Sequence, residues 1–307
     1  MQNKANHWYA VVNPSAGSGK TIKLWEAIKT ALEASGLILE YAFSEYAGHE
    51  AILSREAILR GHAQIIAVGG DGTIQKVVRG VYMQNKVPVK KILVGVIPSG
   101  TGNDWIKSHG IPLDYKKAIK IILKKNIKTQ DVGKIEVFGK TKREYHFINY
   151  AGAGFDCFVL SRLDRYKKFG PLSYFICAII NFMKFKNLPV SIELDALKVR
   201  ANVFLLGVGL CSFTGGGMRL TKDADPFDGC FDITIAQDFT KLDIVKNIPR
   251  LFNGGLFKDK KVFTHRSKTV RVGSKERPVV SQIDGEVLEK GVLVYTLIPE
   301  GFTFCSP

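Results

Sequence analysis

The sequence is poor in cysteine and has no paired cysteines. The five that occur are widely spaced and odd in number, namely Cys157, Cys177, Cys211, Cys230 and Cys305. Because no C-x-x-C pair is present, neither a zinc site nor a disulfide framework is indicated. We expect reduced, mostly buried thiols, which is typical of a cytoplasmic protein.

Long apolar runs are also missing. The first residues contain no apolar h-region, so no signal peptide is expected. The longest apolar run, residues 174–183, is about half the ~20 residues that a membrane-spanning helix needs. Internal repeats and low-complexity tracts are absent, and the hydrophobic share of 46% is ordinary for a globular protein. The protein is therefore expected to be soluble or peripherally bound to a membrane.

Acidic residues are scarce relative to basic ones. The chain has 28 Asp and Glu against 44 Lys and Arg, which gives a formal net charge of +16. Such a charge favours an anionic partner, whether phosphate, nucleic acid or an acidic membrane surface, although solubilising surface charge is an alternative. Nucleic acid is not expected as a partner, because no recognition helix or aromatic RNA-binding motif is found.

With 307 residues, the chain is long enough for two domains. Its first part alternates strand and helix patterns, which is typical of a parallel sheet covered by helices. The expected elements are strand 8–13, helix 21–34, strand 37–43, helix 49–60, strand 64–68, a helix with Ile74, Val77, Val78 and Val81 on one face, strand 92–97, and a helix capped by Asp114.

The second part favours antiparallel strands. Residues 190–194, 231–235 and 293–297 alternate with period two between turn residues, and two helical stretches, 170–186 and 241–253, interrupt them. We therefore predict an α/β plus β protein. A parallel α/β nucleotide-binding domain would span residues 1–128. An antiparallel β-sandwich-like domain with inserted helices would span 129–307, with the extreme C-terminus able to return to the first domain and the active site in the cleft between domains.

A glycine-rich turn joins strand 64–68 to the next helix. It consists of Gly69, Gly70, Asp71, Gly72 and Thr73. The glycines allow the backbone to approach phosphate oxygens, and the N–H groups at the start of the helix favour anions. A carboxylate beside phosphate needs a cation between them, so Asp71 suggests Mg²⁺. The alternative is a tight turn with a helix-capping Asp.

Two further loops follow strands in the same way. Residues 98–104 form a second glycine-rich turn, and the two turns would meet at the carboxyl edge of the sheet, where open α/β folds bind ligands. Residues 13–21 resemble a Walker A loop, but Pro14 stands where that motif needs Gly. Lys20 could contact a phosphate or be a solvated lysine at a helix start.

Together these three loops resemble the catalytic domain of the diacylglycerol kinase family, which sphingosine and ceramide kinases share. Their spacing fits the bacterial soluble members. The resemblance continues in the second half of the chain, at residues 149–156, 215–217, 228–229 and 284–286. It implies an ATP-dependent kinase whose acceptor is the hydroxyl of a lipid, most simply diacylglycerol or a related glycerolipid, with ATP and Mg²⁺ as cofactors.

The resemblance also assigns site residues. The catalytic candidates are Asp71, Asp284 and Glu286, and which of the last two takes the proton stays open. An alternative interpretation of residues 284–286 is a plain hairpin turn. The residues implied for nucleotide binding are Asn13, Pro14, Ser15, Ala16, Gly17, Ser44, Gly69, Gly70, Asp71, Gly72, Thr73, Ile74, Gln75, Lys76, Gly100, Thr101, Asn103 and Asp104.

A metal loop is implied near residue 228. By the resemblance, the ligands of a structural Mg²⁺ would be Asp225, Asp228 and the backbone carbonyl of Cys230, and Asp131 would link this site to the active site. Residues 220–225 depart from the family pattern, because family members commonly carry a Pro after the glycine-rich stretch and this chain has none there. A plain Asp-Gly turn is the alternative.

Access to a lipid requires contact with a membrane surface. Residues 162–186 place basic side chains on both sides of an apolar stretch, which suits peripheral docking on anionic lipid; a buried core helix is the alternative. A homodimer is compatible with the sequence. Two other functions stay open: an NAD kinase-like small-molecule kinase, and a catalytically silent lipid-binding regulator.

Overall fold

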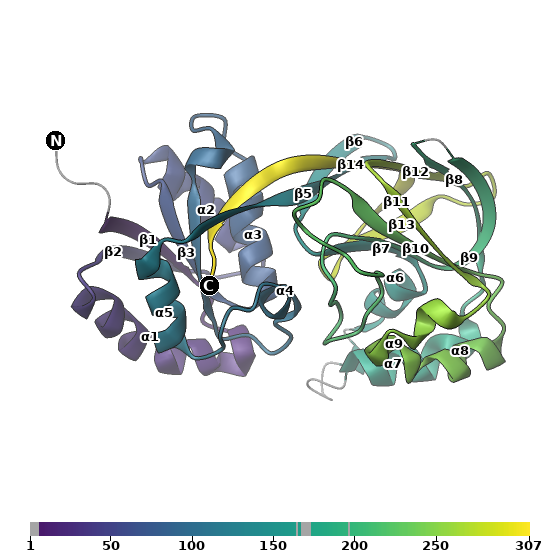
Figure 1. Cartoon of the computed structure of the whole chain (residues 1–307), viewed down its shortest axis with the longest axis horizontal. Coiled ribbons are helices and arrows are strands. Elements are labelled where there is room, and N and C mark those ends of the chain that lie inside the picture. The colour runs from purple at the N-terminus through teal and green to yellow at the C-terminus, as the bar shows by residue number, and fades with distance from the viewer. Residues whose placement is uncertain (1–5, 164, 167–172, 196) are drawn as a thin grey trace. The chain divides into compact units, whose positions relative to one another are not determined.

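The computed structural model describes residues 6–163, 165–166, 173–195 and 197–307. It divides the chain into two compact units (Figure 1). Unit 1 consists of Met1–Gln130 together with Glu300–Pro307, and unit 2 consists of Asp131–Pro299. Among the described residues, no helix combines the length and the apolar character needed to cross a membrane.

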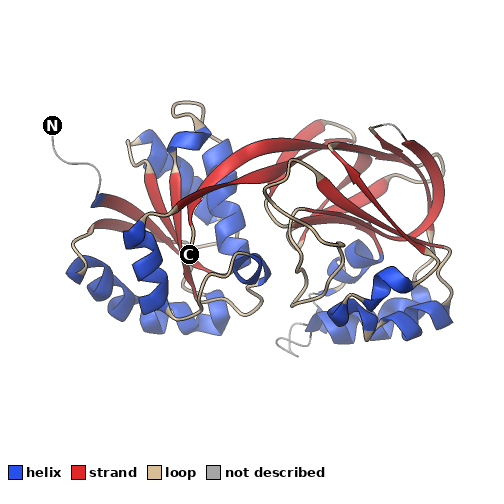
Figure 2. Cartoon of the chain, in the orientation of Figure 1, coloured by secondary structure: helices blue, strands red, loops and turns tan. Residues whose placement is uncertain are grey.

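Unit 1 is a parallel sheet with helices on both faces (Figure 2). The strand order is β14-β4-β3-β1-β2, and every neighbouring pair is parallel. Its elements are β1 (His7–Val12), α1 (Ala16–Ala34), β2 (Ile38–Phe43), α2 (His49–Leu59), β3 (Gln64–Gly69), α3 (Asp71–Tyr82), η2 (Val89–Lys91), β4 (Leu93–Pro98), α4 (Asp104–Ser108), α5 (Tyr115–Lys124), the start of β5 (Ile127–Phe138) and the end of β14 (Glu286–Cys305).

Apolar periodicity explains the packing of these helices. The side chains of Ile74, Val77, Val78 and Val81 on α3 are at most 2% exposed, as expected for one buried helix face. Helices α1 and α5 pack their apolar side chains into a single core with those of β1, β3 and β4. Asp114 caps α5 as predicted, because its carboxylate accepts a hydrogen bond from the Lys117 N–H at 2.9 Å.

Unit 2 is built from antiparallel strands with a helical cover on one side. Its elements are β5, β6 (Lys142–Phe147), β7 (Tyr150–Gly154), α6 (Phe155–Leu160), α7 (Ser173–Asn181), η4 (Phe182–Lys184), β8 (Leu188–Leu194), β9 (Leu197–Gly209), β10 (Phe231–Gln237), α8 (Lys241–Asn247), α9 (Arg250–Asn253), η5 (Gly255–Lys258), β11 (Val262–Ser267), β12 (Thr269–Gly273), β13 (Val279–Ile283) and β14. Figure 2 shows α7, α8 and α9 together beside the strands.

The strand pairings of unit 2 close a ring. Strand β9 pairs with β7, β7 with β13, β13 with β14, β14 with β12, β12 with β8, and β8 again with β9. Strands β10 and β11 extend the sheet beyond β9. Closure leaves these six strands without a free edge between them, so unit 2 is a rigid support for the loops and helices it carries.

Two helical predictions need correction in unit 2. The stretch predicted at 241–253 is divided into α8 and α9, because Pro249 lies between them and cannot donate a helical hydrogen bond. In the stretch predicted at 170–186, α7 covers Ser173–Asn181 and a 3-10 turn follows, whereas residues 170–172 lie outside the described residues.

Candidate functional site

The parallel strands of unit 1 end level with one another. In the register of β3 and β4, Gly69 lies opposite Pro98, so both glycine-rich turns begin at the same edge. The N–H of Asn13, which follows β1, donates to the carbonyl of Val68 near the end of β3 at 3.0 Å. The N–H of Ser44, which follows β2, donates to the carbonyl of Val12 at the end of β1 at 2.8 Å. The structure thus brings four loops with predicted site residues to one carboxyl edge.

Glycines allow these loops to touch through their backbones. A Cβ atom added to Gly100 would lie 2.4 Å from the Cα atom of Gly70, and one added to Gly17 would lie 2.1 Å from the carbonyl oxygen of Ser99. Neither position tolerates a side chain. The surface at this edge is therefore made largely of backbone groups, which suits close approach to a phosphate.

The loop after β1 has an unusual conformation. Gly17, Ser18 and Gly19 all have positive φ angles, of 60°, 57° and 81°, so regular helix begins only at Lys20. Successive N–H groups in such a turn form a concavity that binds anions. The Thr21 hydroxyl holds this loop in place, because it lies 2.6 Å from the hydroxyl of Ser99 in the second turn.

Asp71 fixes the position of the second turn. Its carboxylate accepts hydrogen bonds from the Asp104 N–H at 2.5 Å and from the Ile106 N–H at 3.5 Å, at the start of α4. Burial raises the pKa of Asp71 to about 6, against the lowering effect of these bonds. The alternative interpretation of Asp71 as a capping residue is thus partly correct. Asp71 binds the N-terminus of α4, whereas the N-cap of its own helix, α3, is Gly70.

A buried glutamate that the sequence analysis missed links the other loops. Glu50 is 3% exposed, and its Oε1 accepts hydrogen bonds from the Asn13 amide at 2.9 Å and from the Ser44 hydroxyl at 3.2 Å. The same amide of Asn13 donates to the Thr73 hydroxyl at 3.2 Å. The sequence signal for Glu50 was only an acidic residue in the first turn of a helix, which is common for electrostatic reasons.

The other predicted nucleotide residues differ in accessibility. Gly72 and Thr101 are exposed and Lys76 is half-buried, whereas Ile74 and Gln75 are buried in α3 with 0% and 3% exposure. The Asn103 side chain donates to the carbonyl of Gly100 at 2.8 Å. The structure therefore brings these residues to one place but directs the side chains of Ile74 and Gln75 into the protein. The remaining members of the set, Pro14, Ser15 and Ala16, lie in the loop after β1.

The acidic motif of unit 2 is a hairpin turn between β13 and β14. Asp284 and Gly285 have φ angles of 45° and 89°, as in the turns that favour Asp-Gly. The Asp284 carboxylate accepts hydrogen bonds from the N–H groups of Ile148 at 3.0 Å, Asn149 at 3.2 Å and Tyr150 at 2.9 Å. Residues 284–286 therefore do form the hairpin turn of the alternative interpretation. The turn also holds the Asp284 carboxylate in a fixed orientation.

A second buried carboxyl supports this turn. The N–H of Gly285 donates to Gln282 Oε1 at 2.9 Å, and the amide of Gln282 donates to Asp156 Oδ2 at 3.1 Å. Asp156 is 3% exposed, and burial raises its pKa to about 6. Asp156 therefore orients the turn that carries Asp284 and Glu286 through one intervening side chain.

The predicted metal loop lies before β10. Asp225 accepts a hydrogen bond from the Phe227 N–H at 3.0 Å, and Asp228 accepts one from the Cys230 N–H at 3.0 Å. Asp131 joins the loop, since its carboxylate accepts from the Gly229 N–H at 2.8 Å. These bonds shape the loop.

The charges around this loop bear on its capacity for a metal. Asp228 forms an ion pair with Arg266. Burial raises the pKa of the neighbouring Asp232 to about 6, and the negative charges of Asp228, Asp223 and Asp225 add to this effect. Within the described part of the chain, no three His, Cys, Asp or Glu side chains are arranged to bind a metal. The excess of negative charge at this loop favours a cation, whereas Arg266 is a competing positive group.

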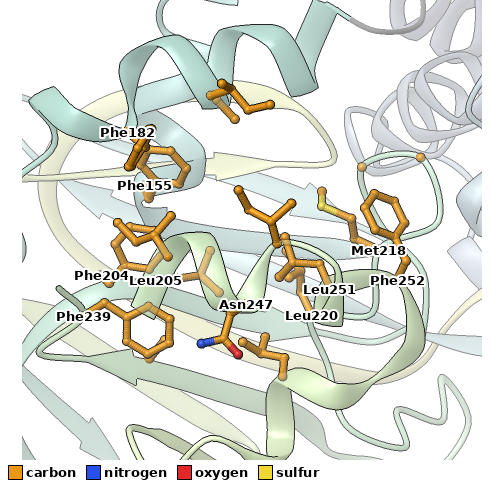
Figure 3. A pocket seen from close by; sticks show the side chains of 18 residues that line it. Phe155, Phe182, Phe204, Leu205, Met218, Leu220, Phe239, Asn247, Leu251 and Phe252 are labelled. Atoms are coloured by element: carbon orange, nitrogen blue, oxygen red, sulfur yellow. The ribbon is translucent and has the colours of Figure 1, made fainter. Parts of the chain in front are cut away.

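Unit 2 also contains an apolar cavity of about 420 Å³ beneath its helices. Its walls come from strands β9 and β10, helices α6, α7, α8 and α9, the turns η4 and η5, and the loops on either side of β10. They include Phe155, Phe204, Met218, Leu220, Phe239 and Leu251. Figure 3 shows Phe155, Phe182, Phe204 and Phe239 gathered at one end, and Met218 with Phe252 at the other. No sequence motif indicated this cavity, because its residues lie on many elements that are far apart in the sequence.

Comparison with known proteins covers nearly the whole chain. Residues 7–135 match the family model of the diacylglycerol kinase catalytic domain. Residues 149–305 match that of the YegS C-terminal NAD kinase β-sandwich-like domain. The two matches follow the division of the chain into an α/β part and a β-rich part.

Individual relatives match most of the chain. A diacylglycerol kinase of Mycobacterium tuberculosis is 29% identical over 266 residues, covering 86% of this chain and 84% of the relative. One of Staphylococcus carnosus is 28% identical over 278 residues, covering 90% and 87%. The crystal structure of a diacylglycerol kinase from Bacillus anthracis superposes with a TM-score of 0.74 over 98% of this chain and 97% of that one, at 22% identity, which demonstrates a shared fold.

Proposed function

The chain belongs to the diacylglycerol kinase family and is an ATP-dependent lipid kinase, and we propose that its acceptor is the hydroxyl of diacylglycerol or of a closely related glycerolipid. The names of its relatives support this acceptor, and so does the apolar cavity of unit 2, which offers a hydrocarbon chain a site. A sphingoid base would present a similar hydroxyl, so the assay must test it beside diacylglycerol.

One observation carries the proposal for the nucleotide. The turns after β3 and β4 begin level, touch through Gly70 and Gly100, and are joined by the hydrogen bonds of Asp71 to the start of α4. A rigid edge of backbone N–H groups is what binding and positioning of a triphosphate require. We assign ATP binding to this edge and to the loop containing Asn13 and Gly17, with Glu50 as the group that orients Asn13 and Ser44.

Some of the predicted nucleotide contacts need a narrower assignment. Ile74 and Gln75 are buried, so we propose that they contribute through the backbone of the first turn of α3. Thr101 and Lys76 are accessible and could contact ATP through their side chains. Lys76 is half-buried as a residue, and its ammonium would offset phosphate charge.

We propose Mg²⁺ as the cation that accompanies ATP. Bound Mg²⁺ would offset the negative charge of the phosphates during transfer. Asp71 would face it from the nucleotide edge, directly or through water. The loop with Asp225, Asp228 and the carbonyl of Cys230 would hold a second, structural Mg²⁺, and Arg266 would have to release Asp228 for it.

The acceptor hydroxyl needs a group that takes its proton. We propose that this group lies in the turn with Asp284 and Glu286. Asp284 is fixed by three backbone N–H groups, which suits it to orient the hydroxyl, and Glu286, half-buried at the start of β14, is the second candidate. Both are carboxylates, which serve as general bases when they lie within hydrogen-bond reach of the hydroxyl.

We further propose that the enzyme works in the cytoplasm, peripherally bound to the membrane. In the predicted docking segment, Ile180 and Met183 are 50% and 61% exposed, and Lys184 and Lys186 follow them. The basic residues Lys167 and Lys168 of that prediction lie outside the described residues. Exchanging Lys184 and Lys186 for Ala should weaken binding to anionic vesicles at low salt, and unchanged binding would contradict the docking proposal. Sedimentation of the purified chain would test the proposed homodimer.

The decisive experiment follows the label from ATP. The chain is incubated with γ-labelled ATP, Mg²⁺ and separate acceptors: diacylglycerol, a sphingoid base and NAD. We expect labelled phosphatidic acid, and strong losses with Asp71→Ala and Asp284→Asn. Labelling of NAD alone would establish the NAD kinase alternative, and the absence of any labelled acceptor would support the silent regulator. If both variants retained full activity, the proposed site would be wrong.

A further inference from the structure

The apolar cavity of unit 2 has the chemistry of a hydrocarbon site. Among its described lining residues, Asn247 is the one with a polar amide side chain, and that amide donates to the Asp243 carbonyl and to the Asp259 carboxylate, both at 2.9 Å. Sites for polar ligands carry a few polar groups that orient the ligand. Here the amide is already engaged in holding α8, so the walls select for hydrocarbon.

The cavity opens where the helices meet solvent. Ile179 on α7 and Phe252 on α9 both line it, and they are 41% and 48% exposed. Helix α8 carries further exposed apolar side chains: Leu242 is 81% exposed and Val245 is 53% exposed. A mouth framed by exposed apolar groups suits a ligand that arrives from a lipid phase.

The size of the cavity limits what it can hold. A cavity of about 150 Å³ binds one benzene molecule, with its six carbon atoms. By this proportion, 420 Å³ accommodates about 17 hydrocarbon carbons. That is the volume of a single long acyl chain, whereas a diacylglycerol carries two.

We propose that this cavity takes one acyl chain of the acceptor lipid, while a second chain, where the lipid has one, stays outside unit 2. This inference rests on the proposed lipid kinase function and makes it more specific. The enzyme then recognises one chain and the hydroxyl, so a glycerolipid with a single long chain is also an acceptor. The length of the bound chain is limited by the cavity.

Two alanines offer a way to shorten the cavity. Ala236 lies on β10 in its floor and is 1% exposed, and Ala178 lies on α7 in its cover and is half-buried. A phenyl ring placed at either position would occupy about 150 Å³ and leave room for about 11 carbons. Ala201 on β9 is 8% exposed and does not line the cavity, so Ala201→Phe is the matched control.

The test compares acceptors of different chain length in the same mixed detergent micelles. Monoacylglycerols and diacylglycerols with chains of ten and of sixteen carbons compete for labelled phosphate from ATP. The parent chain should phosphorylate 1-palmitoylglycerol with a kcat/KM within about tenfold of that for dipalmitoylglycerol. Ala236→Phe should lower the preference for sixteen over ten carbons at least tenfold, and Ala201→Phe should leave it within about twofold.

Each outcome decides a separate point. If diacylglycerol is phosphorylated and monoacylglycerol is not, a single chain is insufficient and the inference fails. If folded Ala236→Phe keeps the parental chain-length profile, the acyl chain lies elsewhere. Should that variant not fold, by circular dichroism, Ala178→Phe repeats the comparison at a less buried position. If the parent labels no lipid at all, the proposed function itself fails. This result differs from a failure of the acyl-chain inference, in which the parent still phosphorylates diacylglycerol.

Discussion

Replacing Asp156 by Asn tests how unit 2 holds its acidic turn. The carboxyl of Asp156 accepts hydrogen bonds from the Gln282 amide at 3.1 Å and from the Cys157 N–H at 2.8 Å. Despite these bonds, burial raises its pKa from 3.8 to about 6. The ionised form is therefore disfavoured in the folded protein, and the structure retains a carboxyl where a neutral side chain would be easier to bury.

The magnitude and sign follow from proton linkage. Because the folded pKa lies above the unfolded one, the contribution of this carboxyl to stability is fully present below pH 3.8 and is lost as the pH rises through about 6. The difference between the two pKa values corresponds to about 3 kcal/mol. Asn is uncharged at every pH but can satisfy only one of the two donors, which costs about 1 kcal/mol. At pH 7.5 the variant should be more stable by about 2 kcal/mol.

The measurement is urea unfolding at pH 4 and at pH 7.5, followed by circular dichroism. All three tryptophans, Trp8, Trp25 and Trp105, belong to unit 1, so their fluorescence reports on that unit and serves as an internal control that should not change. Because the unfolded carboxyl is already about half ionised at pH 4, the parent should lose about 2 kcal/mol relative to the variant between the two pH values. If the free energy of unfolding changed with pH in the same way in the parent and the variant, the claim that burial raises the pKa of Asp156 would be refuted.

Five further outcomes are expected. Glu286→Gln should lower kcat at least ~100-fold without a change in unfolding if Glu286 is the base, and an unchanged kcat would exclude it. Asp284→Asn should also destabilise unit 2 by about 2 kcal/mol, since the carboxylate accepts three backbone hydrogen bonds; equal stability would contradict this anchoring. Glu50→Ala should raise the KM for ATP about tenfold, because Asn13 and Ser44 lose their common acceptor, and an unaltered KM would separate Glu50 from nucleotide binding. Removing Mg²⁺ with a chelator should abolish activity, and Asp228→Asn should raise the Mg²⁺ concentration for half-maximal activity about tenfold, an effect whose absence would argue against the second metal.

Local chemistry was predictable from the sequence in unit 1. The periodic apolar residues on α3, the cap at Asp114 and the glycine turns are determined by neighbours within a few residues, and each was found where the pattern placed it. The same reasoning was less successful in unit 2. The expected helix at 241–253 is interrupted because a proline within it outweighs the apolar pattern on either side.

Long-range contacts were not predictable. The role of Glu50 depends on Asn13 and Ser44, which reach it from two other strand ends. The cavity depends on residues brought together from helices, strands and loops far apart in the sequence, and the closed ring of strands depends on β8 pairing with both β9 and β12. A single sequence contains no signal for such long-range contacts, because each residue involved has an ordinary local explanation as a capping acid, a core residue or a strand residue.

The two most conspicuous acidic residues share one structural property. Asp71 is held by backbone N–H groups at the start of α4, and Asp284 by those of residues 148–150. A carboxylate anchored in this way keeps its orientation, so it need not reorganise when charge develops on a substrate. The same anchoring means that removing either carboxylate also releases a neighbouring segment. Loss of activity alone therefore does not identify a base in this enzyme, and only a variant that loses kcat while keeping its unfolding transition assigns that role.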